Sequence, residues 1–253
     1  MALPEQTLEL AVLMLGACLG GFASGLTGFG YSLVALGIWL HALPPQIAAP
    51  LTVLCSVASQ ALIIPRMWRT VEWRKAAPFI FAGSAGVPIG TELLALVDAS
   101  LFKRALGAFL VGYSGFMLLG NARSAARRSG DWRGEMADAG IGFVGGVLGG
   151  FSGLSGSIMV VWATVRGWGK DEKRGIFQAF NFSLLVVSGL SHAMHGLHTA
   201  AVGMAVIIAV PLSLIAASMG HRVYLRLSAR RFDRVVSWLL LASGAGLLLA
   251  PAR

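Results

Sequence analysis

The residues best suited to chemistry are two matching pentapeptides built from glycine and hydroxyl-bearing side chains. Ser-Gly-Leu-Thr-Gly occupies positions 24–28, and Ser-Gly-Leu-Ser-Gly occupies positions 152–156, at an offset of 128 residues. Each lies inside a long apolar segment, where such a cluster would release backbone N–H and C=O groups from helical hydrogen bonding. A helix that restarts after the break has free N–H groups and a partial positive charge at its N-terminus, which suit an anion. The pair predicts an anion-binding site, with close helix packing through small residues as the alternative.

Two amides and one hydroxyl are expected to complete this site. Gln178 and Asn181 are three residues apart, which places both amides on one helix face. Polar side chains at membrane depth face the protein interior, and Thr52 follows the first pentapeptide at a comparable distance. Ordinary hydrogen bonding between helices is the alternative explanation of the amides. The candidate substrate-binding residues are Ser24, Gly25, Thr27, Gly28, Thr52, Ser152, Gly153, Ser155, Gly156, Gln178 and Asn181.

Two other features could carry chemistry. Glu92 is the one acidic residue well inside an apolar segment, so it could accept and release protons during transport. Alternatively, it lies at the outer end of its span, close to Asp98. His192, His195 and His198 recur at every third position, which could ligate a metal, although interfacial histidines explain the pattern more simply. The sequence has no Walker motif, zinc signature or catalytic Ser/His/Asp arrangement, so we expect no enzyme activity, cofactor or resident metal.

The composition determines the class of protein that must position these residues. The chain has 253 residues, of which 56% are hydrophobic and 12% charged, and its mean hydropathy is +0.75. Soluble domains carry about 25% charged residues. Apolar stretches of about 20 residues are long enough to cross a hydrocarbon core of about 30 Å. These properties exclude a soluble enzyme and a disulfide scaffold, and they predict an all-α, multi-pass membrane protein.

The pattern of apolar segments predicts the topology. Clear spans are expected at residues 46–65, 76–97, 105–120, 175–195, 199–220 and 235–252. Two other segments, 8–40 and 139–166, are interrupted by Gly, Ser and Thr and exceed one membrane thickness. As a single straight helix, residues 8–40 would be about 50 Å long. We therefore expect each of these two segments to enter the membrane and return as a broken-helix hairpin.

Charge supports the hairpins. Clusters at 66–75, 123–133, 166–174 and 222–234 hold 17 of the 20 Lys and Arg residues. With two hairpins, all four clusters fall on one side, which the positive-inside rule makes cytoplasmic. The net charge of +9 is thus explained by membrane orientation, and no nucleic-acid partner is expected.

This topology divides the chain into two inverted repeats. The first repeat covers residues 1–120, a basic cytoplasmic linker covers 121–136, and the second repeat covers 137–253. Each repeat is a hairpin followed by three spans, and both termini are expected outside the cytoplasm. Inverted repeats with broken helices that meet near the membrane midplane are typical of secondary transporters.

Three short runs of residues, two of them glycine-rich, carry a family resemblance. They are Gly-Gly-Phe-Ala-Ser-Gly-Leu-Thr-Gly-Phe-Gly at 20–30, Ala-Ala-Pro-Leu-Thr at 48–52, and Gly-Gly-Phe-Ser-Gly-Leu-Ser-Gly at 149–156. These runs resemble the sulfite exporter TauE/SafE family, and the resemblance covers almost the whole chain. It implies movement of sulfite, sulfonated carbon compounds or related small anions, generally outward across the bacterial inner membrane. The second glycine-rich run differs from the more glycine-rich form expected, because Ser157, Ile158 and Met159 follow Gly156.

The sequence therefore predicts a secondary transporter that exports a small anion such as sulfite or a sulfonate. Its partners are the lipid bilayer and that substrate; the coupling ion and a homo-oligomeric state are left open. Two alternatives remain. One is a metal-cation transporter that uses His192, His195 and Met194, and the other is a membrane scaffold or assembly factor that transports nothing.

Overall fold

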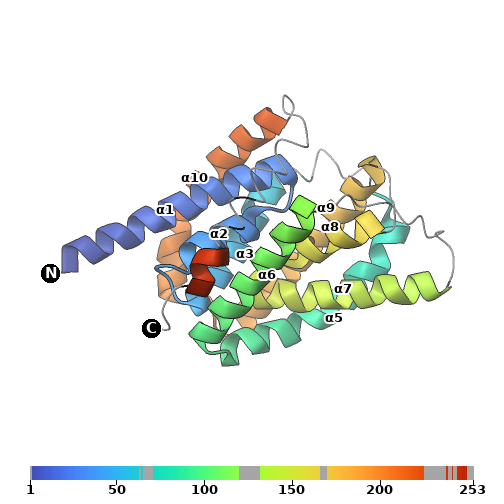
Figure 1. Cartoon of the computed structure of the whole chain (residues 1–253), viewed down its shortest axis with the longest axis horizontal. Helices are drawn as coiled ribbons and strands as arrows, with labels where there is room; N and C mark the ends of the chain where they lie inside the picture. The colour runs from blue at the N-terminus through green and yellow to red at the C-terminus, as the bar shows by residue number, and fades with distance from the viewer. Residues whose placement is uncertain are drawn as a thin grey trace.

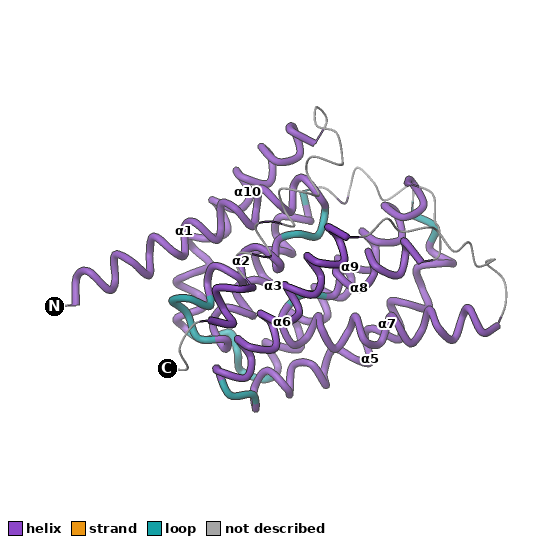
Figure 2. The backbone as a smooth tube through the Cα atoms, in the orientation of Figure 1, coloured by secondary structure: helices purple, strands orange, loops and turns teal. Residues whose placement is uncertain are grey.

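The described part of the chain is helical and contains no strand. The computed structural model describes residues 2–62, 64, 71–119, 132–165, 170–224, 238, 241 and 244–249. The helices are α1 (Ala2–Thr27), α2 (Tyr31–Trp39), α3 (Pro45–Ala61), α5 (Trp73–Leu96), α6 (Ala99–Leu119), α7 (Trp132–Ser152), α8 (Ser155–Val165), α9 (Lys170–Met194) and α10 (Ala200–Tyr224). Figure 1 shows that the N-terminal end of α1 projects beyond the bundle, and Figure 2 shows the described loops, in teal, as short segments.

Four helices are long and apolar enough to cross a membrane. They are Thr7–Thr27, Trp73–Leu96, Gly175–Met194 and Ala200–Val223. These four confirm the prediction of a multi-pass helical membrane protein. Most of the predicted linker 121–136, most of the predicted final span 235–252 and much of the basic clusters lie outside the described residues.

Helix α6 begins six residues before its predicted span because a carboxylate caps it. Asp98 Oδ2 accepts hydrogen bonds from the N–H groups of Ser100 at 3.1 Å and Leu101 at 3.2 Å. These bonds, and a bond from the Ser100 hydroxyl, lower the pKa of Asp98. A capped start of this kind is sufficient to bring the charged residues 103 and 104 into the helix.

Two short helices fold back along the helices that precede them. Helix α2 has 9 residues and α8 has 11, so they are only about 14 and 17 Å long. Trp39 Nε1 in α2 donates to the carbonyl of Leu13 in α1 at 3.0 Å, and Trp162 Nε1 in α8 donates to Asp138 Oδ1 in α7 at 2.7 Å. Within residues 8–40 the helix is interrupted between Thr27 and Tyr31, and within residues 139–166 it is interrupted between Ser152 and Ser155.

Glycines bring two further pairs of helices into close contact. Helix α1 packs on α10, and α5 packs on α7, which lie side by side in Figure 1. A Cβ at Gly21 or Gly25 would overlap the backbone of α10, and a Cβ at Gly146 or Gly150 would overlap the backbone of α5. Small residues permit this approach in membrane bundles. Helices α3 and α9 contact each other between these pairs, and both are largely buried.

Candidate functional site

The site is built around two helix breaks with the same backbone geometry. Gly28 has φ +83° and Gly153 has φ +70°, a left-handed conformation that glycine adopts without strain. The Gly28 N–H donates to the carbonyl of Ser24, and the Gly153 N–H donates to that of Gly149, each at 2.7 Å. These bonds end α1 and α7. Helices α2 and α8 then begin, and their first N–H groups have no acceptor within their own helix.

A buried hydrogen bond joins the two breaks. Ser32 lies in the first turn of α2, and its Oγ donates to the carbonyl of Gly153 at 2.7 Å. A Cβ at Gly153 would lie 2.9 Å from that Oγ, so α2 begins directly against the second break. The sequence analysis missed Ser32. The signal was present, because a hydroxyl four residues after the first break lies in the first turn of the new helix.

Helix α9 places one amide beside each break. A Cβ at Gly28 would lie 2.7 Å from Gln178 Oε1, so the Gln178 amide faces the first break. At the second break, Ser155 Oγ donates to Asn181 Oδ1 at 2.8 Å. Both amides are 2% exposed. The spacing of three residues therefore places both side chains toward the breaks.

Thr52 lies near the second break, but its hydroxyl is already bonded. Its Oγ1 donates to the carbonyl of Ala48 in α3 at 2.7 Å. A Cβ at Gly153 would lie 3.2 Å from Val53 Cγ2 and 3.7 Å from Thr52 Cγ2. Helix α3 thus contacts the second break through the methyl groups of Thr52 and Val53.

The remaining candidates of the first break differ in their hydrogen bonding. Ser24 is fully buried, and its Oγ has no hydrogen-bond partner. Thr27 Oγ1 donates to the carbonyl of Ala23 at 2.8 Å and accepts from the Gly30 N–H at 2.8 Å. Gly25 lies within α1, where a Cβ would overlap the carbonyl of Ala217 in α10. Close helix packing thus accounts for the absence of a side chain at Gly25.

At the second break, all three hydroxyls are bonded. Ser155 donates to Asn181 as described above, Ser152 Oγ donates to the carbonyl of Leu148 at 3.2 Å, and Ser157 Oγ donates to that of Leu154 at 2.6 Å. Gly156 lies in the first turn of α8, where a Cβ would be 2.8 Å from Asn181 Oδ1.

The two pentapeptides do not occupy equivalent positions around the breaks. Gly28 is the fifth residue of the first pentapeptide, whereas Gly153 is the second residue of the other. The breaks are therefore 125 residues apart instead of 128. Small residues are used both where helices pack closely and where a helix breaks. Aligning the two pentapeptides by residue identity therefore pairs Gly25, which packs against α10, with Gly153, which forms a break.

Glu92 lies on α5, whereas His192 contacts the last turn of α7, just before the second break. The Glu92 side chain is exposed on α5. His192 is fully buried instead of interfacial, and its Nε2–H donates to the carbonyl of Gly150 at 2.6 Å. His195 Nδ1–H donates to the carbonyl of Ser191 at 2.8 Å. Within the described ranges, no three His, Cys, Asp or Glu side chains are grouped to hold a metal.

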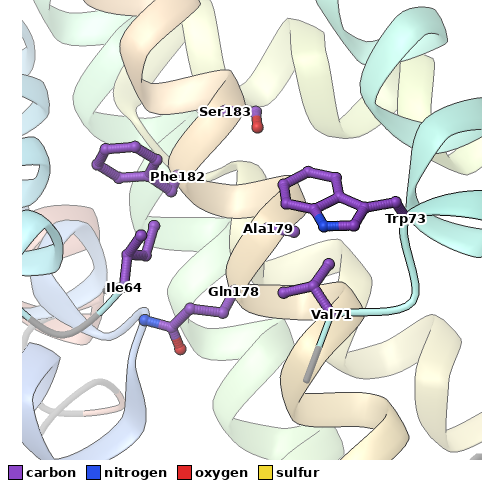
Figure 3. A pocket seen from close by; sticks show the side chains of 7 residues that line it. All are labelled: Ile64, Val71, Trp73, Gln178, Ala179, Phe182 and Ser183. Atoms are coloured by element: carbon purple, nitrogen blue, oxygen red, sulfur yellow. The ribbon is translucent and has the colours of Figure 1, made fainter. Parts of the chain in front are cut away.

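A small pocket lies beside Gln178, the amide that faces the first break (Figure 3). Its lining residues are Ile64, Val71, Trp73, Gln178, Ala179, Phe182 and Ser183. Gln178 extends from α9 at its edge, and the amide reaches toward the backbone that carries Gly28. None of the buried residues in the described part of the chain is Lys, Arg, Asp or Glu. An anion here would be held by neutral donors and helix N-termini.

Comparisons with known proteins identify the family of the chain. The family model of the sulfite exporter TauE/SafE matches residues 13–247. A probable sulfite/organosulfonate exporter TauE of Cupriavidus necator is 29% identical over 252 residues, covering 97% of this chain and 96% of that protein. A probable membrane transporter protein of Xylella fastidiosa (strain Temecula1) is 26% identical, with 94% of each chain covered. No solved structure matches the chain significantly. This chain belongs to the sulfite exporter TauE/SafE family of membrane transporters.

Proposed function

We propose that the protein is a secondary transporter that exports a small oxyanion, such as sulfite or an organosulfonate, across the bacterial inner membrane. The observation that carries the proposal is the meeting of the two helix breaks, joined by the bond from Ser32 to Gly153. Each break is followed by a helix N-terminus and flanked by an amide of α9. The name of the Cupriavidus necator relative supports the substrate class.

The free donors at the first break support an anion as the ligand. Ser24 Oγ and Gln178 Nε2 are buried without a hydrogen-bond partner. Leaving such a group unpaired costs about 1–3 kcal/mol, which a bound anion would recover in part. The N-termini of α2 and α8 add favourable charge of about 0.3–2 kcal/mol each. These small terms predict modest affinity and easy release, as an exporter requires.

We further propose that the chain consists of two inverted repeats, residues 1–120 and 137–253. Two sets of packing contacts support this relation. Helix α1 packs on α10 through glycines four residues apart, Gly21 and Gly25, and α7 packs on α5 through Gly146 and Gly150 with the same spacing. An inverted repeat places both termini outside the cytoplasm. A reporter fused after Arg253 should give an extracytoplasmic signal, and a cytoplasmic signal would contradict the topology.

Proton coupling through Glu92 is a separate proposal. Its carboxylate is exposed on α5 and lies four residues before the end of that helix. A polar side chain this close to the end of a membrane span can reach the interface. Glu92→Gln should therefore make sulfite flux less sensitive to an imposed proton gradient without changing the fold.

Sulfite flux into proteoliposomes of the purified protein tests the proposed function. Sulfate and methanesulfonate serve as competitors, and liposomes without protein provide the background. Saturable sulfite flux with competition is expected. Absence of flux for all three anions in correctly inserted protein would overturn the proposal and favour the metal-cation or scaffold alternative.

A further inference from the structure

A second group of buried polar side chains lies on α3, outside the breaks. Ser56, Ser59 and Gln60 are each at most 1% exposed. The two hydroxyl oxygens and both polar atoms of the Gln60 amide have no hydrogen-bond partner. Buried polar groups in folded proteins are nearly always paired, so four unpaired atoms within five residues need an explanation.

The helical spacing aligns this group with the site. Successive positions 52, 56 and 60 lie one turn apart on one side of α3. Near residue 52, the same side of α3 meets the second break, through Thr52 and Val53. Gln60 is about 10 Å further along the helix, at a rise of 1.5 Å per residue from Val53. Four residues beyond Gln60, Ile64 lines the pocket beside Gln178. Along α3, Gln60 thus lies between the second break, which Thr52 and Val53 contact, and the pocket, which Ile64 lines.

The donor set indicates which ligand this group would take. The Gln60 amide offers two N–H donors at one end and an acceptor oxygen at the other. An anion with acceptors only would leave that oxygen unpaired, whereas an anion that also carries an O–H group satisfies both ends. The buried residues in the described part of the chain include no Lys or Arg, so none of them balances a second negative charge.

We infer that Ser56, Ser59 and Gln60 form a second binding station for the transported anion, on its path along α3 between the pocket and the second break, selective for a singly charged oxyanion that carries a proton. Hydrogensulfite has this chemistry. Methanesulfonate carries the same charge and three oxygens but has no O–H donor. This inference rests on the proposed function. It adds a second position at which the anion binds and specifies the protonation state of that anion.

Gln60→Met tests the station because methionine has a similar length and no hydrogen-bonding amide. The measurements are the thermal midpoint in detergent and sulfite flux in proteoliposomes at mildly acidic pH, where hydrogensulfite predominates. We expect the thermal midpoint to rise, because an unpaired buried amide is removed. We also expect the KM for sulfite to rise about tenfold, the change that corresponds to one lost hydrogen bond with a charged partner. A residue with a purely structural role would not combine higher stability with weaker binding.

The preference between anions gives a second readout. In the unmodified protein, the affinity for sulfite should exceed the affinity for methanesulfonate. Gln60→Met should reduce the ratio of these two affinities at least about fivefold, because a hydrogen-bond acceptor for the ligand is lost. Ser56→Ala is the smaller second variant and should move both readouts in the same direction. Ser114→Ala is the matched control, because Ser114 is buried in α6 and its hydroxyl is already bonded to Leu110.

The outcomes separate the two levels of the proposal. Normal KM and normal anion preference in both Gln60→Met and Ser56→Ala would overturn the station while leaving the transporter intact. Absence of saturable flux in the unmodified protein would overturn the proposed function itself, and the station with it.

Discussion

The two helix breaks share one backbone geometry but differ in how their side chains are bonded. Both turn at a glycine with positive φ whose N–H donates to a carbonyl four residues earlier. At the second break, Ser152, Ser155 and Ser157 all donate to protein acceptors, whereas Ser188 Oγ, beside Gly149 one turn earlier, is buried without a partner among the described residues. At the first break, Ser24 Oγ and Gln178 Nε2 have no partner.

This difference in hydrogen bonding indicates that one break supports the site and the other binds the anion. A fully bonded polar cluster fixes a single conformation, whereas unpaired buried groups carry an energetic penalty that a ligand can remove. We therefore interpret the second break as the support of the site and the first as the part that contacts the anion. The bond from Ser32 to Gly153 then positions the N-terminus of α2, which follows the first break, against the support.

The largest effects are expected at the two glycines. In Gly28→Ala and Gly153→Ala, an alanine in the left-handed region costs about 1–2 kcal/mol. The new Cβ would also lie 2.7 Å from Gln178 Oε1 in the first variant and 2.9 Å from Ser32 Oγ in the second. We expect flux to fall about tenfold or more in both, as such an energy change allows. Gly28→Ala should mainly raise KM, and Gly153→Ala should mainly lower the thermal midpoint.

Gly196 provides the matched control. It also has positive φ, at +70°, but a Cβ there would meet nothing within 4 Å. Gly196→Ala therefore carries the backbone strain alone and should retain most of the flux. Equal loss in all three variants would mean that strain, and not the contacts of the breaks, explains the effect.

Substitutions of the two amides of α9 should have different effects on the stability of the protein. Asn181→Ala leaves Ser155 Oγ buried without its acceptor, which should lower the free energy of unfolding by about 1–3 kcal/mol. Gln178→Met removes an unpaired Nε2, so stability should be unchanged or higher while sulfite affinity falls several-fold. Thermal melting together with flux measures both. A destabilised Gln178→Met with normal affinity would reverse our assignment of the two breaks.

Much of this arrangement could be predicted from the sequence. The excess length of residues 8–40 and 139–166 and their clusters of small residues located both breaks. The spacing of Gln178 and Asn181 placed both amides on the face of α9 that meets them. Both inferences depend on local periodicity and on the cost of unpaired backbone in a membrane, which are properties of the chain itself.

The register of the breaks could not be found by matching residue identities. Gly25 packs against α10, whereas Gly153, the residue aligned with it by the pentapeptide match, forms a break. Glycine spacing gives the better match. Glycines at 20, 21, 25 and 28 recur at 145, 146, 150 and 153, each 125 residues later. The contact of Ser32 with Gly153 joins residues 121 positions apart, and only tertiary packing reveals it.

The smallest effect is expected from the hydroxyls of Ser24 and Ser152, which precede the two breaks. Replacing them tests directly whether the two breaks have different roles. Ser24→Ala removes a hydroxyl with no protein partner, so stability should not change, while sulfite flux should fall about two- to tenfold if that hydroxyl donates to the anion. Ser152→Ala removes only a bond to the Leu148 carbonyl of its own helix, and flux should stay near that of the unmodified protein. Loss in Ser152→Ala but not in Ser24→Ala would exchange the roles of the two breaks. Unchanged flux in the double variant Ser24→Ala/Ser152→Ala would mean that neither hydroxyl binds the anion. The helix N-termini and the amides of α9 would then be the donors that hold it.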